Sequence, residues 1–158
     1  MRYIDLHVHS NCSDGTFSPE ELVVLGIKQE LVAFALTDHD TISGVERAIK
    51  KAEEFDNKIQ VIPGMELSCK YTISSSQSVE IHMLGYRYDI HNKKLIATLE
   101  DISNERDERN RKMCSNLQNA GFPISYDMLC ERFGDTILTR AHFARLLLEN
   151  GGVPSLDY

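Results

Sequence analysis

The feature that most constrains the fold is a continuous apolar run, LVAFAL at residues 31–36, between two segments with helical patterns. An apolar run without alternation is typical of a strand that is covered on both faces, as in parallel sheets. Residues 3–6 and 58–62 are further short segments of strand character. Because strands and helices alternate along the chain, the sequence predicts an α/β fold with a parallel sheet and right-handed crossovers.

The two segments between these strands carry signals for helix starts. Ser18 offers an N-cap and Pro19 suits the first helical position, so we expect a helix that extends to about residue 30. Ser43 and Glu46 form the pattern of a capping box, which predicts a second helix that extends to about residue 55.

A Pro-Gly pair at residues 63–64 is expected to end the third strand. Residues 65–73 and 79–88 then have strand character on either side of the polar loop SSSQS. This arrangement predicts a β-hairpin that follows the parallel strands.

Beyond residue 90 the sequence predicts helices, at residues 94 to about 119, 125–133 and 139–149. The charged run 105–112 within the first of them is expected to be a solvated helix face. We therefore expect an α/β body over residues 1–90 and a helical appendage over residues 91–158.

Composition limits the classes of function. The net charge of −7 argues against a general surface for DNA or RNA, which would be basic. The sequence starts without a signal-peptide pattern and has no apolar run of membrane-spanning length. The four cysteines form no CxxC pair, and their spacing suggests neither a zinc knuckle nor a disulfide framework. These observations favour a reducing, cytoplasmic setting without a membrane.

The segment IDLHVHSNCSDG, residues 4–15, is the first candidate site. Side chains two residues apart share a face of a strand, so Asp5, His7 and His9 point the same way if the strand extends that far. Two imidazoles at a strand end are a natural pair of metal ligands, and Asp5 is close enough to orient one of them by a hydrogen bond. The turn at Asp14-Gly15 could fold a second carboxylate over the same place.

Three further candidates lie at or beyond later strands. His39 follows the apolar run, Glu66 follows the Pro-Gly pair, and His82 lies inside an apolar strand. In parallel α/β folds the C-terminal ends of the strands converge on one rim. The sequence therefore predicts one site that draws on six side chains: His7, His9, Asp14, His39, Glu66 and His82.

The donor set indicates the kind of metal. Four nitrogen donors and two carboxylates suit zinc, manganese or iron, whereas calcium and magnesium prefer shells of oxygen. Six side chains exceed the needs of one tetrahedral zinc ion. We therefore expect two metal ions that share a bridging carboxylate, with Glu66 as the candidate bridge.

Other interpretations stay open for single residues. His82 could be a hydrogen-bonded histidine of the core, and Asp38 and Asp40 could cap the following helix. Cys12 is expected to pack as a small apolar residue. A catalytic Cys/His pair that includes Cys12 competes with the metal site, although no sequence feature marks this thiol as a thiolate.

Four ordered motifs, DLHVHSNCSDG, LTDHDT, PGMELS and HMLGY, together resemble the PHP domain, named for polymerase and histidinol phosphatase. The similarity is greatest to its stand-alone phosphoesterases, which include nucleotide phosphatases and a 5′→3′ exoribonuclease. The segment TRAHFARLLLENG, residues 139–151, resembles part of the helical insertion of that subgroup. The resemblance covers roughly residues 1–150.

The resemblance implies a distorted (β/α)7 barrel with a helical insertion and a trinuclear metal centre at the C-terminal ends of the strands. It implies two or three divalent ions of manganese, zinc or iron, and Arg140 matches an arginine near the substrate phosphate. The implied activity is metal-dependent hydrolysis of phosphate esters of nucleotides or RNA 5′ ends. The positions that match the family's ligands are His7, His9, Asp14, His39, Glu66 and His82, with Glu66 as the bridge.

The resemblance also implies ligands in an H-P motif and a late D-x-H pair, and the 158 residues contain neither. We therefore expect residues 1–90 to be the N-terminal part of a barrel and residues 91–158 an insertion or cap, in a chain truncated before the remaining strands. A half barrel exposes an edge strand, which predicts a partner or self-association. A non-catalytic metal-binding or interaction module and a polymerase-associated proofreading domain stay open as alternatives.

Overall fold

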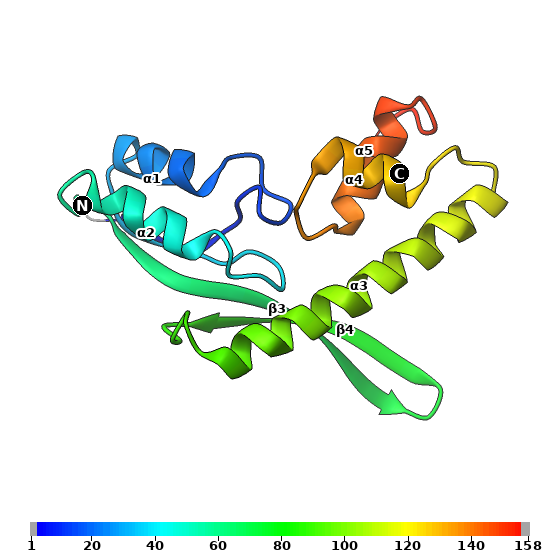
Figure 1. The fold of residues 1–158 in the computed structure, drawn as a ribbon, viewed down its shortest axis with the longest axis horizontal. Helices are drawn as coiled ribbons and strands as arrows, with labels where there is room; N and C mark the ends of the chain where they lie inside the picture. The colour runs from blue at the N-terminus through cyan, green and yellow to red at the C-terminus, as the bar shows by residue number, and fades with distance from the viewer. Residues whose placement is uncertain (1–2, 156–158) are drawn as a thin grey trace.

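A four-stranded sheet organises the computed structural model, which describes residues 3–155 (Figure 1). Its strands lie in chain order: β1 (Tyr3–Val8), β2 (Leu31–Leu36), β3 (Gln60–Ser74) and β4 (Gln77–Tyr86). The first three strands pair in parallel, and β4 pairs antiparallel with β3. The predicted α/β fold with parallel strands followed by a hairpin is therefore confirmed, whereas the (β/α)7 barrel stays a prediction.

Two helices, α1 (Pro19–Lys28) and α2 (Val45–Glu53), connect the parallel strands and lie on one side of the sheet (Figure 1). The predicted start of α1 is confirmed, because the Ser18 hydroxyl accepts a hydrogen bond from the Glu21 backbone and the Glu21 carboxylate accepts one from the Ser18 backbone. The helices and strands bury a common apolar core: Leu22, Val23, Phe34, Leu36, Val45, Ala48, Ala52, Ile59 and Val61.

The predicted capping box of the second helix is wrong. The N-cap of α2 is Gly44, which has no side chain to offer, and the backbone N–H of Ser43 donates to the Thr41 hydroxyl at 3.2 Å. A Cβ on Gly44 would lie 3.0 Å from side-chain carbons of Leu36 and Pro19, so close packing of the helix start favours glycine there.

The predicted break at residues 63–64 is also wrong, because β3 continues through both residues. Pro63 is the last residue of β3 to pair with β2, and Gly64 is the first to pair with β4. A proline has no N–H to donate, so it fits the point where the strand changes partners. The strand therefore carries its direction from the parallel part of the sheet directly into the hairpin.

Three helices follow the sheet, as the sequence predicts: α3 (Lys93–Asn119), α4 (Tyr126–Phe133) and α5 (Arg140–Glu149). In Figure 1, α3 runs diagonally from the sheet to the other two helices. Together they bury a second apolar cluster, which contains Cys114, Ile124, Leu129, Leu138, Phe143 and Leu146. None of the helices between residues 3 and 155 has the length and apolar character needed to cross a bilayer.

The expectation of a solvated helix face over residues 105–112 fails at two positions. Arg106 is only 8% exposed and Asn110 only 1% exposed. The Nδ2 group of Asn110 and the Nη1 group of Arg106 donate to the Leu138 carbonyl at 3.2 and 3.3 Å. The side of α3 that carries Arg106 and Asn110 is therefore packed against the segment before α5 and makes buried polar contacts with it.

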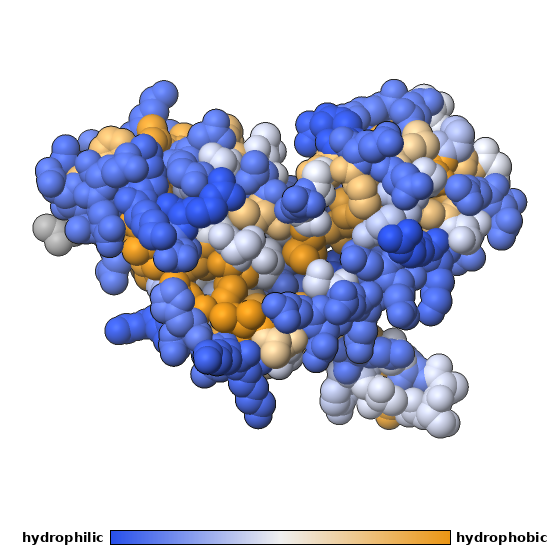
Figure 2. Space-filling view, in the orientation of Figure 1, coloured by the Kyte–Doolittle hydropathy of each residue, from blue (hydrophilic) through white to orange (hydrophobic). Residues whose placement is uncertain are grey.

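The sheet is curled, and its two outer strands, β1 and β4, carry solvent-exposed apolar side chains. The Tyr86 hydroxyl on β4 donates to the Leu6 carbonyl on β1 at 2.8 Å, although these strands occupy opposite edges of the sheet. Large apolar side chains on both strands are exposed, among them Ile4 at 57% and Met83 at 58%. Figure 2 shows apolar surface beside the sheet, below the two covering helices.

Candidate metal centre

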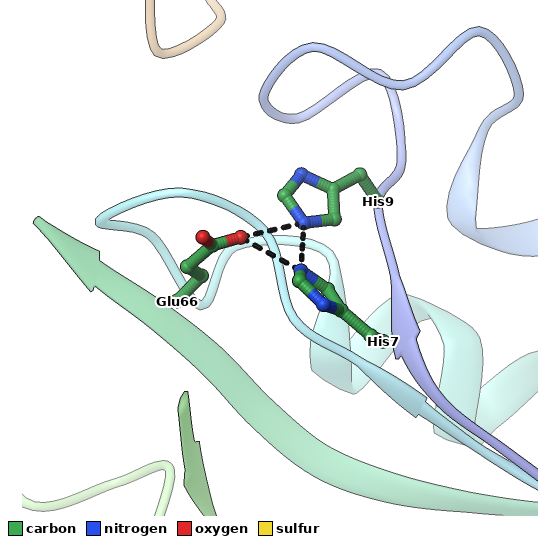
Figure 3. Close-up of side chains that lie close together, drawn as sticks. All are labelled: His7, His9 and Glu66. Carbon is green, nitrogen blue, oxygen red and sulfur yellow. Dashed lines mark hydrogen bonds and ion pairs between the residues drawn. The ribbon is translucent and has the colours of Figure 1, made fainter. Parts of the chain in front are cut away.

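The C-terminal end of β1 brings two imidazoles together (Figure 3). The Nε2 atoms of His7 and His9 lie 3.0 Å apart. Both also face one carboxylate oxygen, Oε2 of Glu66, at 2.8 and 2.9 Å respectively. Three donor atoms from β1, its following loop and β3 therefore converge within hydrogen-bonding distance.

The loop after β1 adds a second carboxylate. Oδ1 of Asp14 lies 2.9 Å from Nδ1 of His9, and its Oδ2 lies 3.4 Å from Nε2 of His39. The buried carboxylate of Asp38 holds this loop in place, because it accepts hydrogen bonds from the Ser10 N–H, the Ser10 hydroxyl and the Ser13 hydroxyl at 2.6–2.7 Å.

His39 and Glu66 meet where the chain beyond β2 pairs with β3. They form an isolated parallel bridge, in which the Asp40 N–H donates to the Glu66 carbonyl and the Glu66 N–H donates to the Asp38 carbonyl. His39 Nδ1 lies 3.7 Å from Glu66 Oε2 and is buried without a hydrogen-bond partner among residues 3–155.

The antiparallel strand β4 supplies His82, whose Nδ1 lies 2.7 Å from Oε1 of Glu66. Its Nε2 lies 3.4 Å from Oε1 of Glu80. The register places His82 opposite Ser68 on β3, so the hairpin folds this imidazole back over the same carboxylate. Glu66 consequently offers one oxygen toward β1 and the other toward β4.

The donor atoms form three overlapping groups in which all members lie within 4.8 Å of one another: His7, His9 and Glu66; His9, Asp14 and His39; His39, Glu66 and His82. Such crowding of imidazole nitrogens and carboxylate oxygens, together with the unpartnered His39 Nδ1, fits bound divalent cations. The structure thus brings all six predicted side chains to one place.

Asp5 lies differently from the sequence-based expectation. Its Oδ1 accepts a hydrogen bond from the backbone N–H of His7 at 3.1 Å, and within the described part of the chain no hydrogen bond joins it to an imidazole. The register of β1 against β2 shifts between Asp5 and Val8, which changes the simple alternation of faces. Asp5 therefore orients the His7 backbone.

The charges within the cluster keep its carboxylates ionised. Burial acts to raise the pKa of Asp14, but contacts with His39 and His9 outweigh it and hold that pKa well below its usual range. Burial has the same effect on Glu66, and the hydrogen bonds from His7 and His82 again leave the pKa lowered. Ionised carboxylates are the form that binds metal ions.

The pKa of His9 shifts in the opposite direction. Burial disfavours the protonated imidazole, but the hydrogen bond to Asp14 and the charges of Asp14 and Glu66 outweigh that effect and raise the pKa. The carboxylates thus attract positive charge to the site when no metal ion is bound.

A cleft of about 130 Å³ adjoins the cluster and brings Arg140 to it, together with Asp14, His39 and His82. Nη2 of Arg140 lies 2.6 Å from Oε2 of Glu80. The hydrogen bond from Arg140 is the largest cause of the lowered pKa of Glu80. The predicted phosphate contact therefore lies beside the cluster, paired with a carboxylate.

Comparison with known proteins shows the family of this chain. The model of the PHP domain matches residues 5–148. The chain belongs to the PHP domain family.

Two curated relatives carry names of hydrolases. A 5′-3′ exoribonuclease of Haemophilus influenzae is 37% identical over 94% of this chain and 52% of its own length. A 3′,5′-nucleoside bisphosphate phosphatase of Chromobacterium violaceum is 32% identical over 99% of this chain and 53% of its own. The chain thus spans about half the length of the curated relatives it matches.

A solved structure has a similar fold. An amidohydrolase from Chromobacterium violaceum, with bound sulfate and no metal, superposes with a TM-score of 0.84 at 32% identity. The match covers 97% of this chain and 52% of the other. The arrangement of strands and helices over the described residues is therefore shared with this solved structure.

Sequence reasoning missed two arginines of the PHP chain, both in α3. Arg109 lines the cleft with Arg140, and its Nε is buried without a partner among the described residues. Burial, followed by the positive charge of Arg106, lowers its pKa. Arg106 is paired with buried Asp40. A spacing of three residues on one helix could have suggested a common face.

Cys12 and the two aspartates beside His39 stabilise the loops around the site and are not among its candidate metal ligands. The Cys12 thiol is buried and accepts a hydrogen bond from Arg47 at 3.6 Å, so the structure offers no support for a Cys/His pair. Asp38 and Asp40 bind Ser10, Ser13 and Ser68 and do not cap α2.

Gly15 lets the loop that carries Asp14 close tightly. A Cβ at Gly15 would lie 2.1 Å from the backbone oxygen of His9 and 2.5 Å from its carbonyl carbon. We expect Gly15→Ala to lower the free energy of unfolding by about 1–3 kcal/mol or more, because backbone cannot move aside as a side chain does. Urea unfolding measures this loss.

Gly85→Ala is the matched control for Gly15→Ala. A Cβ at Gly85 meets no atom within 4 Å, so its free energy of unfolding should stay within about 0.5 kcal/mol of the parent. Equal stability of the two variants would show that the loop around Asp14 relaxes freely.

Proposed function

We propose that this chain belongs to a metal-dependent phosphoesterase that hydrolyses phosphate esters of nucleotides or RNA 5′ ends. The observation that carries the proposal is the convergence of four imidazoles and two carboxylates into three overlapping groups. The names of two relatives, an exoribonuclease and a nucleoside bisphosphate phosphatase, support this substrate class.

Each of the three groups is suited to one cation. His7, His9 and Glu66 would hold one, and His9, Asp14 and His39 a second. His39, Glu66 and His82 would hold a third. Glu66 belongs to two groups and has two oxygens to divide between them, whereas His9 and His39, which also belong to two groups each, would each bind one cation. Two or three ions of manganese, zinc or iron fit these donors. Such cations supply Lewis-acid stabilisation of phosphate charge and lower the pKa of water.

The arginines at the cleft would hold and orient the substrate. Arg109 and Arg140 both line the cleft, and Nε of Arg109 is buried without a partner among residues 3–155. A guanidinium matches phosphate oxygens with two parallel N–H groups. Glu80 holds Arg140 until an anion competes for it. Positive charge thus gathers beside the cluster in a chain with a net charge of −7.

The parts of the chain have different roles in this proposal. Residues 1–90 form the N-terminal part of a (β/α)7 barrel and carry the metal ligands, while residues 91–158 form an insertion or cap that carries the arginines. The exposed apolar side chains of β1 and β4 suit burial against further barrel strands or a second copy. The four free cysteines accord with a cytoplasmic location.

The test is phosphate release by the intact protein that contains this chain, stripped with EDTA and then titrated with Mn²⁺, Zn²⁺ or Fe²⁺. A 3′,5′-nucleoside bisphosphate, 5′-phosphorylated RNA and a generic aryl phosphate are the substrates. We expect turnover that depends on added cation and disappears with chelation. Tight binding of a single ion without turnover would favour the non-catalytic module and contradict the proposal.

A further inference from the structure

Arg106 makes buried contacts outside the group of candidate metal ligands. Its side chain lies on α3, and its Nε and Nη2 groups contact Oδ2 of Asp40 at 2.6 and 2.5 Å. Nη2 also donates to the Ser68 hydroxyl at 2.8 Å, and Nη1 donates to the Leu138 carbonyl at 3.3 Å. One guanidinium therefore joins three segments that are distant in sequence.

The first two segments carry metal-ligand candidates. Asp40 directly follows His39, and its backbone N–H donates to the Glu66 carbonyl at 3.0 Å. The other carboxylate oxygen of Asp40, Oδ1, accepts the Ser68 N–H at 2.7 Å. Asp40 thus binds β3 at Glu66 and again at Ser68, two residues further on, and Arg106 joins the same network from α3.

The backbone conformation of Asp40 is unfavourable and needs contacts with other segments to stabilise it. Its φ angle is +50°, a conformation that a residue other than glycine adopts at a cost of about 1 kcal/mol or more. The carboxylate is buried at 1% exposure, so it also needs a compensating charge. Arg106 supplies that charge and fixes the direction in which the loop leaves His39.

The third segment leads to the cleft. Leu138 precedes Thr139, the N-cap of α5, and Arg140 is the first residue of that helix. The Leu138 carbonyl accepts hydrogen bonds from both Arg106 and Asn110. The position of Arg140 relative to the imidazoles consequently depends on the same side of α3.

We propose that Arg106 is a positioning residue, which sets the spacing between His39 and Glu66 and so determines how tightly the site binds cations. The inference rests on the proposed metal centre and assigns Arg106 no contact with metal or substrate. Its planar fork reaches Asp40, Ser68 and Leu138 at once, which a lysine ammonium cannot do.

The first test is Arg106→Lys in the 158-residue chain, which keeps the charge opposite Asp40 and removes the fork. We expect the affinity for Mn²⁺, measured by titration calorimetry, to fall about 10- to 100-fold. The visible absorption of the Co²⁺-loaded chain should change as well, because it reports the geometry of the ligands. Thermal unfolding of the metal-free chain gives the stability separately.

Arg111→Lys is the matched control, since it makes the same change on the same helix. Arg111 stacks over the Tyr126 ring at 3.9 Å, and the site contains neither residue. Its Mn²⁺ affinity and Co²⁺ spectrum should equal those of the parent chain. A similar loss in both variants would attribute the effect to general loosening of α3 and overturn the inference.

A milder variant covers the case in which Arg106→Lys fails to fold. Ser68→Ala removes one acceptor of the guanidinium and leaves the buried ion pair intact. We expect a smaller loss of Mn²⁺ affinity at unchanged thermal stability. Parent-like affinity and Co²⁺ spectrum in Arg106→Lys, or in Ser68→Ala if the first cannot be studied, would overturn the inference. Absence of Mn²⁺ binding by the parent would instead overturn the proposed metal centre.

Discussion

Replacing Glu66 by glutamine is expected to lower the affinity for Mn²⁺ by at least about 100-fold and to remove metal-dependent turnover. Oε2 of Glu66 lies within 2.9 Å of Nε2 of both His7 and His9, and Oε1 lies 2.7 Å from Nδ1 of His82. An amide keeps the shape but loses the charge, and its NH₂ group cannot coordinate a cation. Titration calorimetry and metal analysis after gel filtration measure the loss.

Glu149→Gln controls for the loss of one negative charge. Glu149 pairs with Arg132 on the surface at 2.8 Å, and it lies at the end of α5, whereas the imidazoles of the site lie on β1, β4 and the loops after β1 and β2. Its Mn²⁺ affinity should match that of the parent chain, because exposed ion pairs contribute little to the fold. If Glu66→Gln kept the Mn²⁺ affinity of the parent chain, the assignment of Glu66 as a metal ligand would be wrong.

Asp38→Ala is expected to cause the largest loss of stability, about 3–5 kcal/mol in the free energy of unfolding. The Asp38 carboxylate is 2% exposed and accepts three hydrogen bonds at 2.6–2.7 Å from Ser10 and Ser13. Alanine would leave these buried donors without an acceptor and release the loop that carries Asp14. Urea unfolding with a fluorescence or circular-dichroism readout measures the change.

Asp89→Ala is the comparison for Asp38→Ala. Asp89 also accepts a backbone N–H, that of His91 at 2.9 Å, but at an exposed position. Water replaces the lost acceptor there, so we expect a loss below about 1 kcal/mol. If the two variants were equally stable, the Asp38 network would not be what holds the loop after β1.

Much of the fold could be predicted from the sequence because its signals are local. The apolar run 31–36 and the Ser18-Pro19 start signal correspond to β2 and α1. The errors arose where packing between distant segments decides. Pro63 stays within β3 because the strand changes its partner there, and Gly44 starts α2 because of its close approach to Leu36.

The candidate metal ligands could be predicted from the sequence, but the surrounding residues that hold them in place could not. The HxH spacing and the positions after strand ends identify the six side chains that the structure brings together. The roles of Arg106 and Arg109 could not be read from the charged run 105–112, since solvated and buried arginines look alike in sequence. Only the crossing of α3 over the sheet distinguishes them.

The spread of the donors along the chain has a consequence for folding. His7 and His82 come from the two outer strands of a sheet whose edges are joined at Tyr86 and Leu6. Cations held by these donors would bind the native form, in which the outer strands lie close together, and not the unfolded chain, so they would stabilise the fold by mass action. The melting temperature of this protein should therefore rise with the logarithm of cation concentration, and purification with chelators should yield a looser sheet.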